Sequence, residues 1–173
     1  MYLISIYFDD TTDKKLNSMM QNVATATGNT FMQDNHVPPH ITVAAVETKH
    51  EDVLITRMEE LTKQLNCGEI KFVSIGSFKS SVWYVQPILN EYLQDMSVLL
   101  ANKLSGLDET ILSPYYRPYS WLPHCTIAKK LSKEQMQQAF EVMQQEFVPM
   151  DAKIKRIGIA KTNPHRDIKV WEL

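Results

Sequence analysis

Apolar runs and amphipathic stretches alternate along this chain, a pattern typical of folds that mix strands with helices. Runs rich in apolar and β-branched side chains favour strands, because such residues suit a pleated surface. These runs are residues 2–8, 39–46, 69–75, 82–87, 122–130, 151–161 and 166–172. Between them, apolar side chains recur at helical spacing. The helices expected from this spacing are residues 12–27, 51–66, 89–107 and 132–147.

Residues that begin and end helices support these boundaries. Asp9 and the polar residues after it offer an N-cap for the first helix, and Gly28 marks its end. Ser132 is suited to cap the last helix. Each of these helices is therefore expected to form as a locally specified unit.

The connecting segments are polar or rich in proline. Residues 29–38 and 108–120 are expected to be loops, and residues 76–81 the turn of a hairpin. No low-complexity linker divides the chain. Residues 1–173 are therefore expected to form one bilobal domain.

One short motif occurs twice. The segment Pro39-His40-Ile41-Thr42-Val43-Ala44 recurs as Pro123-His124-Cys125-Thr126-Ile127-Ala128. Proline, histidine, threonine and alanine are identical in the two copies, and the fifth residue is β-branched in both. The copies are separated by close to half the chain, which indicates a duplicated unit with one motif in each half.

Strand geometry gives each copy a polar face. Side chains alternate along a strand, so His40 and Thr42 point to one side, and so do His124 and Thr126. The proline before each histidine cannot donate to a sheet ladder and fits the first position of a strand. Each motif therefore predicts an imidazole and a hydroxyl that project from a strand start onto one face of a sheet.

Two histidines in one site can act as general base and general acid near neutral pH. A single histidine is more often structural, but core packing gives no reason to repeat a histidine and a threonine on one face. A metal site is the alternative, and the ligand spacing for it is absent. His36 lies four residues before His40, yet Pro38 and Pro39 exclude a helical ligand pair. We expect no metal and no cofactor.

These motifs resemble those of the two-histidine (2H) phosphoesterase superfamily, in particular its bacterial 2′-5′ RNA ligase and cyclic phosphodiesterase branch. The resemblance rests on the two motifs, the opening run 2–8, the segment Ile75-Gly76-Ser77-Phe78, and Trp121-Leu122-Pro123-His124. It covers essentially the whole chain. It implies an α+β fold with pseudo-twofold symmetry, in which two antiparallel sheets line a central cleft and the helices pack on the outside.

The resemblance also implies an activity and its residues. The expected reaction is metal-independent hydrolysis of 2′,3′-cyclic phosphates or of 2′-5′-linked nucleotides. His40 and His124 are the expected catalytic residues, one as base and one as acid, and the sequence does not assign which is which. Thr42 and Thr126 are expected to donate to the phosphate oxygens. The alternatives are an RNA ligase or end-repair enzyme, which runs the same site in reverse, and a non-catalytic binder of nucleotide or RNA.

Two aromatic residues are further candidates for substrate binding. Phe78 is suited to stack on a base, and its alternative role is a lid over the core. Tyr119 precedes the second motif and is suited to contact phosphate or ribose, and its alternative role is to anchor the loop. Lys129 and Lys130 follow the second motif and have two possible roles. They either make the electrostatic potential near the site more positive or are simply solvent-exposed at the end of a strand.

Composition narrows the possible ligands and compartment. A 173-residue chain that is 44% hydrophobic is expected to bury a sizeable core. Its net charge of −2 argues against electrostatic binding of long nucleic acids, so a small nucleotide or an RNA-end phosphoester is the expected partner. Cys67 and Cys125 give no disulfide framework. With no signal peptide and no membrane-length apolar run, we expect a cytoplasmic monomer.

Overall fold

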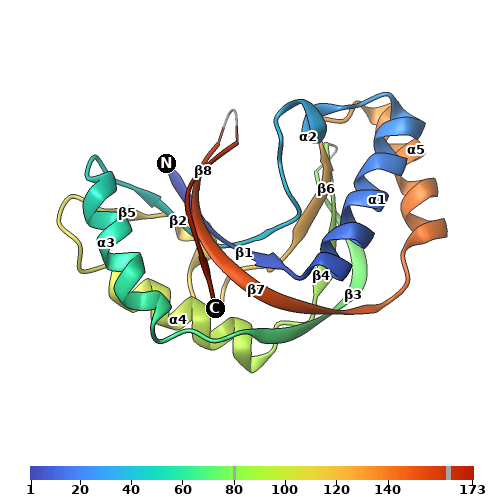
Figure 1. Ribbon diagram of the computed structural model, residues 1–173. Helices are drawn as coiled ribbons and strands as arrows, with labels where there is room; N and C mark the ends of the chain where they lie inside the picture. The colour runs from blue at the N-terminus through green and yellow to red at the C-terminus, as the bar shows by residue number, and fades with distance from the viewer. Residues whose placement is uncertain (80, 163–164) are drawn as a thin grey trace.

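One curved antiparallel sheet forms the centre of the computed structural model, which describes residues 1–79, 81–162 and 165–173 (Figure 1). The strand order is β1-β2-β6-β4-β3-β7-β8, with β5 paired to β2 and β7 also paired to β1. The strands are β1 (Tyr2–Phe8), β2 (Ile41–Glu47), β3 (Gly68–Phe78), β4 (Val82–Pro87), β5 (Ile111–Leu112), β6 (Cys125–Lys129), β7 (Met150–Lys161) and β8 (Arg166–Glu172).

The expectation of an α+β fold with antiparallel strands and helices is confirmed, but the expectation of two separate sheets is wrong. Two long strands join what would otherwise be two sheets. Strand β3 pairs with β7 over its first residues and with β4 over its last ones. Strand β7 in turn pairs with β3 near its start and with β1 and β8 further along. These pairings and the pairing of β2 with β6 at Ile41 and Cys125 make the sheet continuous.

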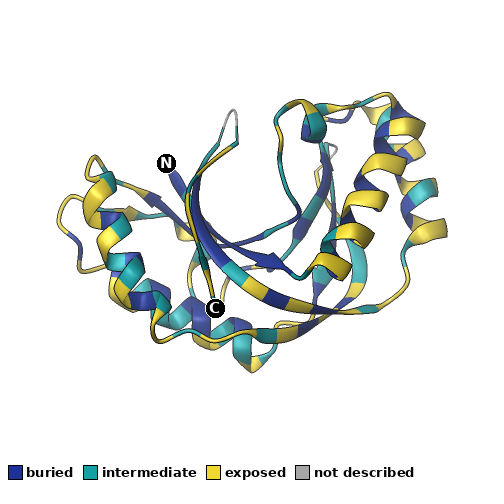
Figure 2. Ribbon diagram, viewed as in Figure 1, coloured by how far each residue is buried: buried dark blue, intermediate teal, exposed yellow. Residues whose placement is uncertain are grey.

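The longer helices lie at two ends of this sheet (Figure 1). Helix α1 (Asp10–Thr27) packs on α5 (Lys133–Glu146) at one end, and α3 (Glu51–Thr62) packs on α4 (Glu91–Leu104) at the other. Figure 2 shows that the strands at the centre are mostly buried, whereas the outer faces of these helices are exposed. The helices therefore cover the outer side of the sheet.

The expected caps are present. The Asp9 side chain accepts a hydrogen bond from the Thr12 amide and caps α1, which begins at Asp10 and not at the expected residue 12. Gly28 ends this helix in the left-handed region, with φ of 67°. Ser132 and Gln135 form a capping box at the start of α5, in which each side chain bonds the other residue's backbone amide. These local signals explain why the helix ends were readable from sequence.

The differences lie in the connections and in two helices, since α3 ends at Thr62 instead of residue 66 and α4 spans Glu91–Leu104 instead of 89–107. The segment 29–38 contains a short helix, α2 (Phe31–Asp34), and the segment 108–120 contains β5 and a 3-10 turn, η1 (Pro114–Tyr116). Strand β3 continues to Phe78, so the hairpin turn is shorter than the expected 76–81. Ser80 of that turn lies outside the described residues.

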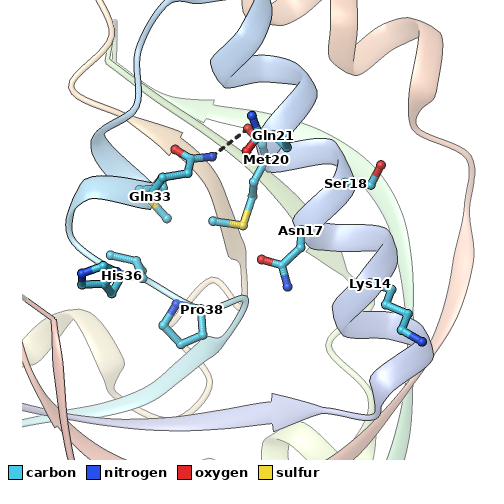
Figure 3. A pocket seen from close by; sticks show the side chains of 10 residues that line it. Lys14, Asn17, Ser18, Met20, Gln21, Gln33, His36 and Pro38 are labelled. Atoms are coloured by element: carbon cyan, nitrogen blue, oxygen red, sulfur yellow. Dashed lines mark hydrogen bonds between the residues drawn. The ribbon is translucent and has the colours of Figure 1, made fainter.

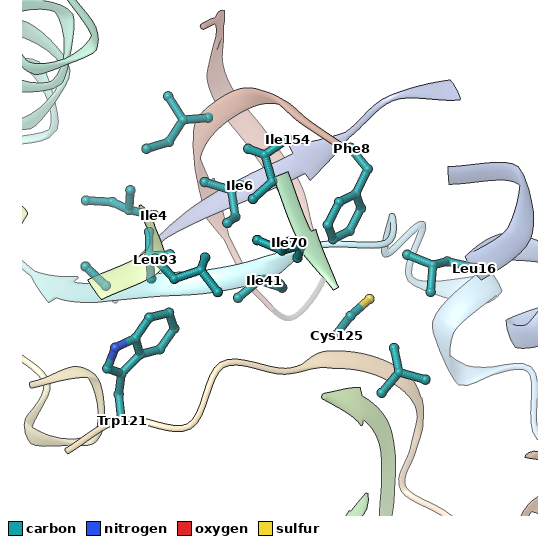
Figure 4. Packing of buried hydrophobic residues seen from close by; sticks show 14 of the residues in the cluster. Ile4, Ile6, Phe8, Leu16, Ile41, Ile70, Leu93, Trp121, Cys125 and Ile154 are labelled. Carbon is teal, nitrogen blue, oxygen red and sulfur yellow. The ribbon is translucent and has the colours of Figure 1, made fainter. Parts of the chain in front are cut away.

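The core lies between the sheet and the helices. From β1, Ile4, Ile6 and Phe8 point into it and are essentially unexposed, whereas Ser5 and Tyr7 point to the other face. Figure 4 shows Ile41 and Cys125 among the core side chains. Cys125 is fully buried, as the strand alternation of its motif indicated. The hydrophobic side of each motif strand thus fixes the direction of its polar side.

Cys67 and Cys125 are both free thiols. Among the helices described, none combines the length and the apolar character required to span a bilayer.

Candidate active site

His40 and His124 stand immediately before two paired strands. Strands β2 and β6 are antiparallel and meet at the residue pair Ile41 and Cys125. In an antiparallel pair, the residue before one partner lies opposite the residue after the other. This register sets His40 across from Thr126, and Thr42 across from His124. The two copies of the motif thus meet on one face of the sheet.

The same register sets the spacing of the imidazoles. His40 and His124 are diagonal neighbours across the strand pair, a relationship that separates residues by roughly 7–8 Å. Both imidazoles are then within reach of one tetrahedral group between them. A phosphate held there also lies beside the two threonine positions.

Each histidine is oriented by the same hydrogen bond. Nδ1 of His40 lies 2.8 Å from the Pro38 carbonyl oxygen, and Nδ1 of His124 lies 2.8 Å from that of Leu122. A carbonyl oxygen only accepts, so each Nδ1 carries the proton. Nε2 is then the atom that each ring offers to a substrate, as a lone pair when neutral and as a donor when protonated.

Burial makes both histidines harder to protonate in the free protein. The pKa of His40 is lowered to about 4. Burial is the main cause, the nearby His165, His124 and Lys129 act in the same direction, and the hydrogen bond to the Pro38 carbonyl opposes them. Burial also lowers the pKa of His124, against the Leu122 carbonyl. Both rings are therefore neutral at pH 7 until an anion arrives, since a phosphate between them favours the protonated form.

The two threonines differ in their surroundings. Thr42 is buried, and its hydroxyl lies 3.3 Å from that of Ser5. Tyr116 lies near Thr42: burial raises the pKa of Tyr116, and the neighbouring Thr42 hydroxyl opposes the effect. Thr126 is half-buried, and within the described residues no side-chain hydrogen bond engages its hydroxyl. Thr126 is therefore the freer donor of the two.

Aromatic rings line the His124 side of the site. Phe78, at the end of β3, has its ring centroid 4.8 Å from that of His124, in an edge arrangement. The ring centroid of Tyr84 lies 5.2 Å from that of His124 and 4.5 Å from that of Phe78. Phe78 is 38% exposed, so its ring is accessible to a ligand. Tyr84 was not identified as a site residue from the sequence. Its place in the site follows from its position on β4, where it pairs with Thr126.

Tyr119 stands apart from this arrangement. It is 80% exposed and has a left-handed φ of 64°. Among the described residues, no hydrogen bond or ring contact joins it to either motif. A role for Tyr119 in substrate binding stays a prediction, and the residue of its loop that reaches the site is Tyr116, through Thr42.

A polar network that the sequence did not indicate lies on the His40 side. The ring centroid of His165 is 6.0 Å from that of His40, and that of Tyr7 is 6.5 Å away. Nε2 of His165 and the hydroxyl of Tyr7 both lie 3.1 Å from Oδ1 of Asp167. Tyr7 points away from the core on β1, and the fold brings Asp167 of β8 within hydrogen-bonding distance of it.

Two hollows flank the segment that leads into β2. A cavity of about 50 Å³ is lined by His40 and His165, among others. A larger, open hollow of about 620 Å³ lies between α1 and α2 and is lined by Asn17, Gln33 and Pro38, among others (Figure 3). It contains no side chain of either motif, so its size does not make it the reaction site. Within the described residues, no group of three histidine, cysteine or acidic side chains is arranged to hold a metal ion.

Comparison with known proteins identifies a sequence family and a fold. The sequence profile of the 2′-5′ RNA ligase superfamily matches residues 14–166. The crystal structure of E. coli LigT complexed with 3′-AMP is similar over 99% of this chain and 97% of LigT, with a TM-score of 0.61 and 13% identity. A crystal structure described as a phosphoesterase is similar over 99% of this chain and 97% of its own, with a TM-score of 0.59 and 16% identity. No curated protein sequence matches. At these identities, the likeness to the two structures establishes the fold.

Proposed function

This chain belongs to the 2′-5′ RNA ligase superfamily, which implies phosphoesterase chemistry, and we propose that it is a metal-independent phosphodiesterase. The proposed substrates are 2′,3′-cyclic phosphates or short 2′-5′-linked nucleotides. One observation carries the proposal. His40 and His124 are held in the same tautomer by the same backbone hydrogen bond and flank one strand pair.

In the proposed reaction, water attacks phosphorus while a ribose oxygen leaves. A neutral histidine takes the proton from the attacking water as the new P–O bond forms. A protonated histidine gives its proton to the ribose oxygen as the old P–O bond breaks. The two imidazoles thus exchange protonation states, and no metal is required for the proton transfers.

We assign the base role to His40 and the acid role to His124. The nearby Lys129 and His165 disfavour a proton on His40, which keeps its Nε2 lone pair available. The rings packed on His124 are those of Phe78 and Tyr84, and burial is what lowers its pKa. A phosphate therefore protonates His124 more readily than His40.

The threonine hydroxyls complete the site. Thr42 and Thr126 lie on the same face as the histidines and are proposed to donate to the non-bridging oxygens, where charge grows during attack. A donor held in place before reaction contributes roughly 2–4 kcal/mol in comparable sites.

Phe78 is proposed to stack on the base of the substrate, because its exposed ring borders His124. Tyr119 is proposed as a further contact from the loop that precedes the second motif. LigT structures complexed with 3′-AMP, ATP and NADP+ support a nucleotide as the ligand of this fold. The partner proposed for this chain is accordingly a small nucleotide or an RNA end.

The same site run in reverse would join a 5′-hydroxyl to a cyclic phosphate, which is the ligase alternative. The superfamily is named for RNA ligase activity, which is the reason to test this alternative. The net charge of −2 favours the hydrolase, because a ligase must also hold a second RNA end.

The test is a turnover screen of nucleoside 2′,3′-cyclic phosphates and 2′-5′ dinucleotides, with and without excess EDTA. Hydrolysis that persists in EDTA is expected. Loss of turnover on chelation, restored by zinc or manganese, would show a metal enzyme instead. Tight binding of the nucleotides without turnover at any pH would show a binding module.

A further inference from the structure

The small cavity beside His40 is lined by polar side chains that, apart from His40, have no role in the proposed reaction. Its polar lining consists of Asn35, His40, Lys129, Thr162 and His165, and apolar side chains including Phe31 close the rest. Its volume of about 50 Å³ accommodates a group of a few heavy atoms and excludes a nucleobase. Among the described residues, the lining contains an ammonium, two imidazoles, an amide and a hydroxyl, and no carboxylate.

Lys129 supplies positive charge that the protein does not neutralise. Its Nζ lies 5.0 Å from the centroid of the Phe31 ring, on the wall of the cavity. Within the part of the chain that the structure describes, no ion pair joins Lys129 to a carboxylate. Burial lowers the pKa of Lys129, and the neighbouring Lys130 lowers it further. An anion in the cavity would relieve both effects.

Asp167 orients the imidazole of His165. The His165 side chain is only 7% exposed. Its Nε2 donates to Asp167, whose carboxylate also accepts from Tyr7. Nδ1 of His165 donates to a phosphate when the ring is in its imidazolium form. The Asp167 charge is thereby engaged by two donors rather than directed at the cavity. His165 is consequently held as a second imidazole beside His40.

We propose that this cavity is a subsite for a terminal phosphate group, so that the preferred substrate carries a second phosphate one nucleoside away from the scissile one. This inference rests on the proposed function, which places the scissile phosphate between His40 and His124. His40 is shared by both spaces, and the His165 ring lies only 6.0 Å from it. A nucleoside 5′-phosphate with a 2′,3′-cyclic phosphate presents two such groups.

The size of the cavity favours a terminal phosphate over an internucleotide one. A phosphodiester continues into a second nucleoside, which a space of about 50 Å³ does not admit. A phosphomonoester also carries more negative charge than a diester at pH 7, which suits the unpaired Lys129. The ligand class is therefore a mononucleotide with phosphates at both ends of the ribose.

The test measures binding, so that it does not depend on turnover. Calorimetry gives the Kd of 3′-AMP, of adenosine 3′,5′-bisphosphate and of the dinucleotide ApAp, which has an internal diester. The bisphosphate is expected to bind wild type at least tenfold more tightly than 3′-AMP or ApAp. In Lys129→Met this preference is expected to fall to twofold or less, and His165→Gln is expected to reduce it as a second, independent variant.

Lys130→Met is the matched control. Lys130 adjoins Lys129 and stands over the same Phe31 ring at 4.5 Å, but it does not line the cavity. This variant is expected to keep the preference. Four outcomes would each overturn the inference. The first two are that wild type binds the bisphosphate no more tightly than 3′-AMP, or no more tightly than ApAp. The other two are that the two lysine variants lose the preference equally, or that neither 3′-AMP nor the bisphosphate binds. A different result would contradict the proposed function instead. In that case the protein would still prefer the bisphosphate in binding but would hydrolyse no cyclic phosphate.

Discussion

Ile41 and Cys125 face each other across β2 and β6, and through this pair the two halves of the chain bring their motifs together. Both side chains are fully buried on the core face. The residues on either side of each then point to the opposite face of the sheet. The hydrophobic pair therefore positions His40, Thr42, His124 and Thr126 without taking part in the proposed chemistry.

Removal of either imidazole tests the acid–base pair. His40→Ala and His124→Ala are each expected to lower kcat for a 2′,3′-cyclic nucleotide by roughly 10²–10⁴-fold. The double variant should be little worse, because residues that act as a unit are non-additive. Steady-state kinetics measures this, with His50→Ala as the control, since His50 is exposed and lies beside Glu109. Independent, multiplying losses would contradict the pairing.

The threonines should separate catalysis from stability. Thr42→Val and Thr126→Val each remove a donor and keep the shape, and each is expected to lower kcat by roughly 10–10³-fold. Thr42→Val also breaks the buried contact with Ser5, which should cost about 1 kcal/mol in the free energy of unfolding. Thr126→Val should leave that free energy nearly unchanged. Urea titrations next to kinetics measure both, and equal stability losses would contradict the difference in their surroundings.

The histidines should titrate in a defined order. NMR titration of the free protein should find the pKa of His40 at about 4 and below that of His124, because Lys129 and His165 stand beside His40. A nucleotide 3′-phosphate should raise at least the His124 value. A His40 pKa at or above that of His124 would reverse the assignment of base and acid.

The same shift has a consequence for stability. His40 takes up a proton more readily when unfolded, near pH 6.5, than when folded, near pH 4. The unfolded state therefore binds more protons between these values, and the contribution of His40 to stability is present above pH 6.5 and is lost as the pH falls toward 4. The drop in Tm between pH 7.5 and pH 4.5 should be smaller in His40→Gln than in wild type. An equal drop in both proteins would argue against burial as the cause.

Phe78 should affect binding more than chemistry. Phe78→Ala is expected to raise KM by about 5–100-fold with a smaller change in kcat, since stacking on a base contributes roughly 1–3 kcal/mol. Phe140→Ala is a matched control, because Phe140 is similarly exposed at 41% and stacks on Trp83 away from the histidines. A KM that is unchanged in Phe78→Ala would leave Phe78 as a lid over Tyr84.

The sequence alone was sufficient for features that local interactions decide. Helix ends followed from side chains that bond the nearest amides, as Asp9 and Ser132 do. Both motif strands, and the polar face of each, followed from the two-residue period of a strand. The family resemblance rested on the same residues, because the repeated histidine and threonine carry the chemistry.

Only the tertiary structure decided how these pieces combine. Strand register is set by partners far apart in the chain, so the meeting of Ile41 with Cys125 has no local signature. The single sheet arises because β2 pairs with β6 and β3 pairs with β7, and periodicity reveals neither pairing. His165 reaches His40 only because β8 pairs with β7, which in turn pairs with β1. The low pKa of His40 has the same origin, since burial and neighbouring charge are properties of the packed chain.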